Sequence, residues 1–350
     1  MNDVFSHPWL GGLFQDAKAA AIWSPDRQVA HMLAFEAALT RAFGDVGTLP
    51  ADVAKDVAET IADFSPNFAA LRSGTARDGV VVPALVQQLR SAVGPHAKAV
   101  HTGATSQDVI DTALALTLRE TNDHLKNSLE TTLAALNDLT ATFGANQMKG
   151  RTRMQVAIPI DVADRIVTWS APLQRHIERL EAIRPRVEVL QLGGAVGNRA
   201  AFADNADAIV ENVANRLNLL STKSAWHSTR DAVADYANLL ALITGSIGKM
   251  GQDICLMTQQ GIDEIVISGG GGSSAMPHKQ NPVLPELLAT LARFNATQVA
   301  GMHHAMLHEQ ERSGAAWSLE WMILPQMAQA TARSLSAATE ICSRITRMGS

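Results

Sequence analysis

The sequence predicts an all-α protein organised around a bundle of long helices. Strand-like alternating runs are scarce, one tyrosine is present in 350 residues, and Ala and Leu fill long uninterrupted segments. The sharpest pattern is an apolar repeat from Val233 to Met257 that alternates steps of three and four residues. A repeat of this period is typical of a helix that packs at a shallow angle in a bundle or coiled coil.

The composition argues against several classes of protein. Hydrophobic residues make up 47% of the chain, enough for a large core, and the formal net charge is -5. No Lys/Arg-rich run is present, so we expect no nucleic-acid partner. The apolar stretches are interrupted and the N-terminus does not resemble a secretory signal, so we expect no membrane segment and a cytoplasmic location. Cys255 and Cys342 are expected to be buried, reduced thiols.

The first part of the chain is predicted to form a smaller N-terminal helical domain at residues 1–108. Ser24 and Pro25 have the residue types of a helix N-cap and first helical position, and Gly44 is expected to end that helix. The other expected elements are helices at 51–63 and 83–93 and an irregular segment at 95–107.

The remainder, residues 109–350, is predicted to form the central long-helix bundle domain. Its expected helices lie at 109–136, 161–184, 233–257, 284–294 and 317–347, with a Gly-rich, less regular segment at 185–203. Helices of this length exceed what an ordinary globular domain uses, so we expect their apolar stripes to be completed by other copies of the chain.

A loop at Gly269–Pro282, with the sequence GGGGSSAMPHKQNP, is suited to binding a small anion. Asn281 and Pro282 are predicted to be the N-cap and first residue of the following helix, whose N-terminus carries free N–H groups and a positive dipole. A flexible Gly/Ser linker is the plainer interpretation, but MPHKQNP is not linker sequence. The loop lacks the GxxxxGK[ST] pattern of a P-loop.

Two further polar loops also precede predicted helices. HTGATSQDV contains Thr105 and Asp108 at capping-box spacing, and GRTRMQVAIPID ends at Asp161. Each loop alone is explained by ordinary helix capping. Together, the three loops are better explained as the walls of one anion-binding pocket.

These three stretches resemble the shared regions of the fumarase/aspartase superfamily. GSSAMPHKQNP matches every fixed position of its signature GSSxMPxKxNP, and HTGATSQD and GRTRMQVAIP are similar to its first and second regions. The resemblance implies a central bundle of the fumarase/aspartase type, a homotetramer with a twenty-helix core, and active sites formed by three subunits. It also implies a third, C-terminal helical domain. Because the sequence stops at Ser350, we expect this domain to be absent, either because the member is naturally short or because its C-terminal part is missing.

The resemblance also implies roles for individual residues. Ser273 would transfer a proton at the carbon beside a carboxylate, and Lys279 would stabilise the charge that develops there. The implied substrate-binding residues are His101, Thr105, Ser106, Gln107, Arg151, Arg153, Gln155, Arg230, His278 and Asn281. No metal or organic cofactor is expected.

Arg153 departs from many lyases of the superfamily, which have histidine at this position. Arginine is a poor proton shuttle but a good carboxylate ligand, so the leaving or attacking group should need no proton. A carboxylate of the substrate itself meets this condition, which favours the lactonising branch of the superfamily and a small tricarboxylate substrate. The stretches 226–231 and 308–321 also resemble that branch. The alternatives are an adenylosuccinate lyase-like C–N lyase that releases fumarate, and a catalytically inactive structural homologue.

Overall fold

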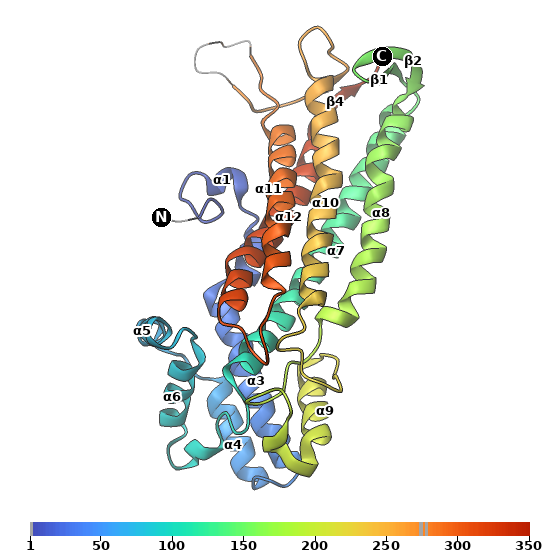
Figure 1. Cartoon of the computed structure of the whole chain (residues 1–350). Helices are drawn as coiled ribbons and strands as arrows, with labels where there is room; N and C mark the ends of the chain where they lie inside the picture. Colours follow the sequence, from blue (N-terminus) through green and yellow to red (C-terminus); the bar gives the residue numbers. More distant parts are fainter. Residues whose placement is uncertain (1–2, 273–275, 277–278) are drawn as a thin grey trace.

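The computed structural model describes residues 3–272, 276 and 279–350. Long helices run side by side along the molecule, and a group of shorter helices covers one end of them (Figure 1). The long helices are α7 (Ser106–Phe143), α8 (Val162–Val187), α10 (Asp231–Met257), α11 (Val283–Ala305) and α12 (Ala315–Arg344). The prediction of an all-α bundle is confirmed.

The shorter elements fill the ends of the bundle. The helices are α1 (Gly11–Phe14), α2 (Ala17–Ile22), α3 (Pro25–Asp45), α4 (Ala51–Ala62), α5 (Phe68–Asp78), α6 (Val82–Ala92) and α9 (Ala206–Leu217), with 3-10 helices η1 (Gly94–Ala99) and η2 (Ala200–Asn205). The strands within the described residues are β1 (Gln147–Thr152), β2 (Gln155–Asp161), β3 (Ile265–Ile267) and β4 (Ile345–Met348).

The apolar repeat of α10 lies at the centre of the bundle. Its residues are buried from Val233 to Met257, and the helix contacts α8, α11 and α12. A second apolar cluster lies among α3 to α6, the start of α7, the strand-like segment near Leu190 and α9. The division of the chain into domains at residue 108 stays a prediction.

Two predicted helix starts are confirmed. The Ser24 hydroxyl accepts a hydrogen bond from the Arg27 N–H at 3.2 Å, and Thr105 and Asp108 form a capping box at the start of α7. The predicted start at Asn281 is wrong, because α11 begins at Val283 with Pro282 in the N-cap position. Asn281 instead donates its N–H to the Gly271 carbonyl at 2.8 Å, which holds its backbone against the glycine arm of the loop.

Two predicted helix ends are also wrong. Gly44 lies inside α3, where a Cβ would approach the Ala54 Cβ to 2.6 Å, so its role is close packing against α4. The last helix ends at Arg344 instead of continuing to 347, because Ile345–Met348 pair with β3. β-branched residues such as Ile345 favour this extended pairing.

The segment predicted as a loop around Lys149–Arg153 is a β-hairpin. Strands β1 and β2 pair with Thr152 opposite Gln155, so Arg153 and Met154 form a two-residue turn. Both have positive φ, 48° and 69°, as a type I′ turn requires. The hairpin therefore presents Arg153 at its tip.

Within the described residues, no helix combines the length and apolar character needed to cross a membrane. Cys255 and Cys342 are both free thiols. Cys342 is buried as predicted, whereas Cys255 is only half-buried, so its predicted burial is wrong.

Candidate active site

The first motif is built around Asp108, whose carboxylate is completely buried. One oxygen accepts hydrogen bonds from the Gly193 N–H and the His227 Nε2, both at 2.8 Å. The other accepts from the Gly194 and Thr105 N–H groups at 2.9 and 3.0 Å. Asp108 thus joins the start of α7 to the glycine-rich segment and to the chain before α10, and it fixes the position of the motif.

Gln107 and Arg312 lie beside this centre. The Gln107 amide is fully buried, donates to the His227 carbonyl at 2.9 Å and accepts from the Arg312 Nε at 2.9 Å. Arg312 also donates to the Ala195 carbonyl at 3.1 Å. Because both ends of the Gln107 amide are occupied, its observed role is to position Arg312. In the part of the chain that the structure describes, Arg312 forms no ion pair, so its guanidinium remains available to an anion.

His101 and Ser106 line the same cavity, which has a volume of about 590 Å³. The His101 Nδ1 lies 2.6 Å from a carboxylate oxygen of Glu36 on α3. Thr105 is half-buried next to Ser106 at the start of α7. The Ser106 hydroxyl and the His101 imidazole therefore border one cavity at the positive end of a long helix, an arrangement that suits a carboxylate.

Arg230 lies behind this surface in a buried ion cluster. Its guanidinium donates to both oxygens of Asp111, at 2.7 and 3.2 Å, and to both oxygens of Glu320, at 2.9 and 2.5 Å. The side chains of all three residues are at most 3% exposed. Since two carboxylates of the same chain occupy the guanidinium, this geometry argues against the predicted binding of substrate by Arg230.

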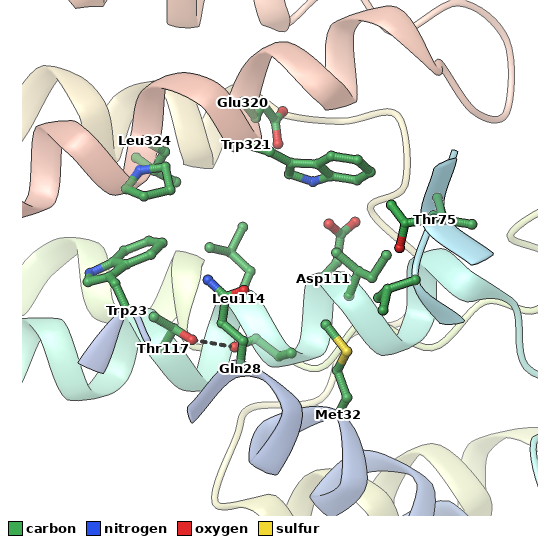
Figure 2. Close-up of a pocket in the computed structure, with 15 residues that line it drawn as sticks. Trp23, Gln28, Met32, Thr75, Asp111, Leu114, Thr117, Glu320, Trp321 and Leu324 are labelled. Atoms are coloured by element: carbon green, nitrogen blue, oxygen red, sulfur yellow. Dashed lines mark hydrogen bonds between the residues drawn. The ribbon is translucent and has the colours of Figure 1, made fainter. Parts of the chain in front are cut away.

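The electrostatics of the cluster follow from its burial. Burial raises the pKa of Asp111 above its usual range, against the lowering effect of Arg230. Burial would lower the pKa of Arg230, but Asp111 and Glu320 raise it, so the arginine remains charged. Asp111 and Glu320 also border a cavity of about 280 Å³ beside the indole rings of Trp23 and Trp321 (Figure 2).

The signature loop lies at the other end of the bundle. Its two arms meet at a bridge between Gly272 and Gln280. Gly271 has φ +79°, and a Cβ there would lie 2.0 Å from the Asn281 carbonyl oxygen, so only glycine fits. Lys279 is exposed and Asn281 is half-buried at the base of the loop. Ser273 and His278 lie outside the described residues.

The hairpin of the second motif lies at this same end (Figure 1). Arg151 pairs with Glu264, which precedes β3, at 2.5 Å. Arg153 and Gln155 are exposed at the hairpin turn. Arg344, at the end of α12, donates to the Gly269 carbonyl at 3.4 Å and lines a cavity of about 210 Å³ with Gly271 and Asn281. This end therefore brings several cations to the base of the signature loop, of which Arg151 is paired with Glu264 and Arg344 with Glu340.

A single chain does not bring all three motifs together. The first motif precedes α7 and the second follows it, and the 38 residues of this helix span about 57 Å at 1.5 Å per residue. The second and third motifs share one end, whereas the first lies at the other. One pocket with three walls therefore requires more than one copy of the chain.

Several residues of the candidate site have weak sequence signals. Glu36 occupies an apolar position of α3, Asp108 reads as a helix cap, and Arg312 and Arg344 lie in no recognised motif. Their roles depend on contacts with residues between 65 and 205 positions away in the chain. Sequence spacing does not reveal such contacts.

Comparisons with known proteins give a consistent result. A family model described as Lyase matches residues 15–301. The chain is 35% identical to a 3-carboxy-cis,cis-muconate cycloisomerase of Acinetobacter baylyi, over 94% of this chain and 75% of that protein. It is 32% identical to an N-acetyl-S-(2-succino)cysteine lyase of Enterococcus italicus, over 90% of this chain and 70% of that protein.

A solved structure agrees with these relatives. The 3-carboxy-cis,cis-muconate lactonizing enzyme of Pseudomonas putida superimposes with a TM-score of 0.92 and 31% identity, covering 97% of this chain and 77% of that one. The matched family model spans all three motifs. The chain therefore belongs to the Lyase family, the fumarase/aspartase superfamily that its motifs resemble.

Proposed function

We propose that the protein converts 3-carboxy-cis,cis-muconate to 4-carboxymuconolactone. Several relatives at about 35% identity carry the corresponding name. The observation that carries the proposal is Arg153, which lies exposed at the hairpin turn on the same end as the signature loop. A permanently charged guanidinium can hold a carboxylate but cannot protonate a leaving group, which suits an internal carboxylate nucleophile.

The proposed reaction forms one C–O bond and one C–H bond. A carboxylate oxygen of the substrate attacks the ring-forming carbon, and the electron pair of the C=C bond moves toward the neighbouring carboxylate. This gives an enediolate-like intermediate with two negative charges on one group. Addition of one proton to the adjacent carbon completes the lactone, so the reaction takes up one proton from the enzyme or solvent.

The residues of the signature loop supply the main stabilisation in this proposal. Lys279 and Asn281 hold the carboxylate that takes up the electron pair, and the free N–H groups at the start of α11 favour the same charge. Ser273 delivers the proton; this role rests on the motif, because Ser273 lies outside the described residues. Arg151 and Gln155, together with His278 of the loop, complete this wall.

The first motif supplies the opposite wall. Thr105, Ser106 and His101 present donors to a second carboxylate, and Arg312 adds a cation held in place by Gln107. Because this wall lies about 57 Å along α7 from the hairpin, estimated from the rise per residue, we propose that different subunits contribute the walls. A homotetramer with shared sites meets this requirement. We also propose a cytoplasmic location, in keeping with two free thiols.

A substrate assay tests the reaction directly. We expect the ultraviolet absorbance of 3-carboxymuconate to fall when the purified protein is added, equally with and without a metal chelator. Adenylosuccinate and N-acetyl-S-(2-succino)cysteine should release no fumarate. Fumarate release without lactone formation would place the protein in an eliminating branch, and binding of the tricarboxylate without turnover would identify an inactive homologue.

Mixing two inactive variants tests the shared site. Ser106→Ala removes a donor of the first wall, and Lys279→Met removes the cation of the signature loop. If the walls come from different chains, hybrids formed by unfolding and refolding the two together contain some sites that carry neither substitution. We expect activity to return to a fraction of the wild-type value in the mixture but in neither variant refolded alone. No recovery, in hybrids shown to have formed, would contradict shared sites.

A further inference from the structure

Glu36 is a carboxylate on the buried face of a helix. It follows the apolar spacing of α3, and it is completely buried among Phe35, Leu39 and their neighbours. Removing a carboxylate from water costs several kcal/mol unless a partner compensates for it. Within the described residues, one oxygen of Glu36 contacts the His101 Nδ1 at 2.6 Å and the other has no partner. Because burying the Glu36 carboxylate in the core is costly, we look for a role of Glu36 other than stability.

The backbone around His101 is bent to make this contact. His101 has φ 61°, in the left-handed region that residues with a Cβ adopt at a cost of about 1–3 kcal/mol. The Thr102 hydroxyl, next in the chain, donates to the Lys98 carbonyl at 2.6 Å and stabilises the bend. The bend turns the imidazole toward Glu36 on α3. The residues next to His101 in the sequence, Val100 and Thr102, carry no carboxylate.

The contact with Glu36 determines which nitrogen of His101 is left for a ligand. A carboxylate is an acceptor, so Nδ1 must be the N–H donor in this pair. Nε2 is then the nitrogen that remains for the cavity that His101 shares with Ser106. The side chain is 15% exposed, which is enough to reach a molecule in that cavity while the ring stays fixed.

We infer that Glu36 is a positioning residue that holds His101 so that Nε2 binds a carboxylate of the substrate. This deepens the proposed function, on which the identity of the substrate rests. With a proton on each ring nitrogen, His101 donates one N–H to the Glu36 carboxylate and the other to a substrate carboxylate. The buried negative charge of Glu36 thereby contributes to anion binding through His101.

The chain contains a matched histidine–carboxylate pair that serves as a control. The His124 Nε2 lies 3.0 Å from an oxygen of Asp16, and both side chains are 10% exposed. This pair joins α2 to the middle of α7, away from the three motifs. Asp16 also caps α2 by accepting the Ala19 N–H, which asparagine can still do. Asp16→Asn therefore removes a comparable charge without touching the site.

The experiment measures binding of tricarballylate, a tricarboxylate that the enzyme cannot lactonise, to the intact protein by calorimetry. Glu36→Gln keeps the shape and an acceptor oxygen but removes the charge. His101→Asn removes the imidazole, and asparagine tolerates the positive φ. We expect each variant to weaken binding about 10- to 100-fold, the usual range for a hydrogen bond to a charged group, and Asp16→Asn to leave affinity unchanged.

The double variant Glu36→Gln/His101→Asn separates positioning from structural support. If Glu36 acts through His101, the double variant binds no more weakly than the weaker single variant, whereas independent effects multiply. An unchanged affinity in Glu36→Gln, or multiplied losses in the double variant, would overturn the inference. His101→Asn provides the answer if Glu36→Gln fails to fold, because unchanged binding in that variant also overturns it. If the wild-type protein does not lactonise carboxymuconate but both single variants lose tricarballylate binding, the inference is supported and the proposed reaction is rejected.

Discussion

Replacing Arg230 with methionine provides the sharpest test of how the buried ion cluster supports the first motif. Methionine keeps much of the volume but leaves the carboxylates of Asp111 and Glu320 buried without a counter-charge. Four hydrogen bonds of 2.5–3.2 Å are lost from side chains that are at most 3% exposed. Breaking a buried ion pair in this way typically costs about 3–5 kcal/mol. That corresponds to roughly a 10²–10⁴-fold change in the unfolding equilibrium.

A surface ion pair provides the matched control. Arg186 lies 2.7 Å from Asp235, but the two side chains are 55% and 48% exposed. Its replacement with methionine should change the free energy of unfolding by about 1 kcal/mol or less. Urea denaturation followed by circular dichroism, at one protein concentration and pH 7, measures both variants. Both free energies of unfolding are calculated from these curves. If Arg230→Met is no more than about 1 kcal/mol less stable than the control, the cluster does not hold α7, α12 and the start of α10 together.

The pH dependence of Arg230→Met provides a second check. Without the guanidinium, burial favours the protonated form of the Asp111 and Glu320 carboxyl groups. The folded variant therefore binds more protons than the unfolded chain. Its free energy of unfolding should therefore rise relative to wild type as the pH falls from 7 toward 4. A stability difference that stays constant over this range would contradict an electrostatic origin.

Three further perturbations have clear expectations. Gly271→Ala should lower kcat by at least about tenfold, because its Cβ would lie 2.0 Å from the backbone oxygen of Asn281 and displace this residue, which we propose binds a carboxylate of the substrate. Gly269→Ala, with φ +72° but open space around the Cβ, should retain most activity in the same assay. Burial lowers the pKa of His176 from 6.5 to about 4, so the unfolded chain takes up its proton first and stability should fall between those pH values. His176→Gln should reduce this loss, as read from urea midpoints at pH 7 and 5. Arg153→His should raise KM more than it lowers kcat, and a gain of fumarate-releasing activity would show instead that Arg153 selects the reaction.

The sequence by itself was sufficient for the fold class and for the family. The repeat from Val233 to Met257 predicts a buried bundle helix because each step of three or four residues returns to the same face. The capping box of Thr105 and Asp108 is local as well, since its hydrogen bonds span three residues. Motif spacing identified the family for the same reason: a motif is a local pattern of residue types.

Features that depend on backbone twist or on distant pairing required the structure. The hairpin around Arg153 was missed because a two-residue turn without glycine or asparagine lacks the usual signal. The end of α12 depends on pairing between Ile345 and Ile267, which are far apart in the sequence. Asn281 has the residue type of a cap, but a bond to Gly271 determines its backbone.

The features of the candidate site also divide into those that the sequence predicted and those that only the structure revealed. Residue types within the motifs predicted an anion-binding pocket with a lactonising preference, because arginine in place of histidine changes the available chemistry. Only the tertiary structure placed the first motif at the far end of α7, engaged Arg230 with Asp111 and Glu320, and joined Glu36 to His101. The physical reason is that the role of a side chain depends on the groups that surround it after folding, and these can come from any part of the sequence. Burial then strengthens the polar contacts among them.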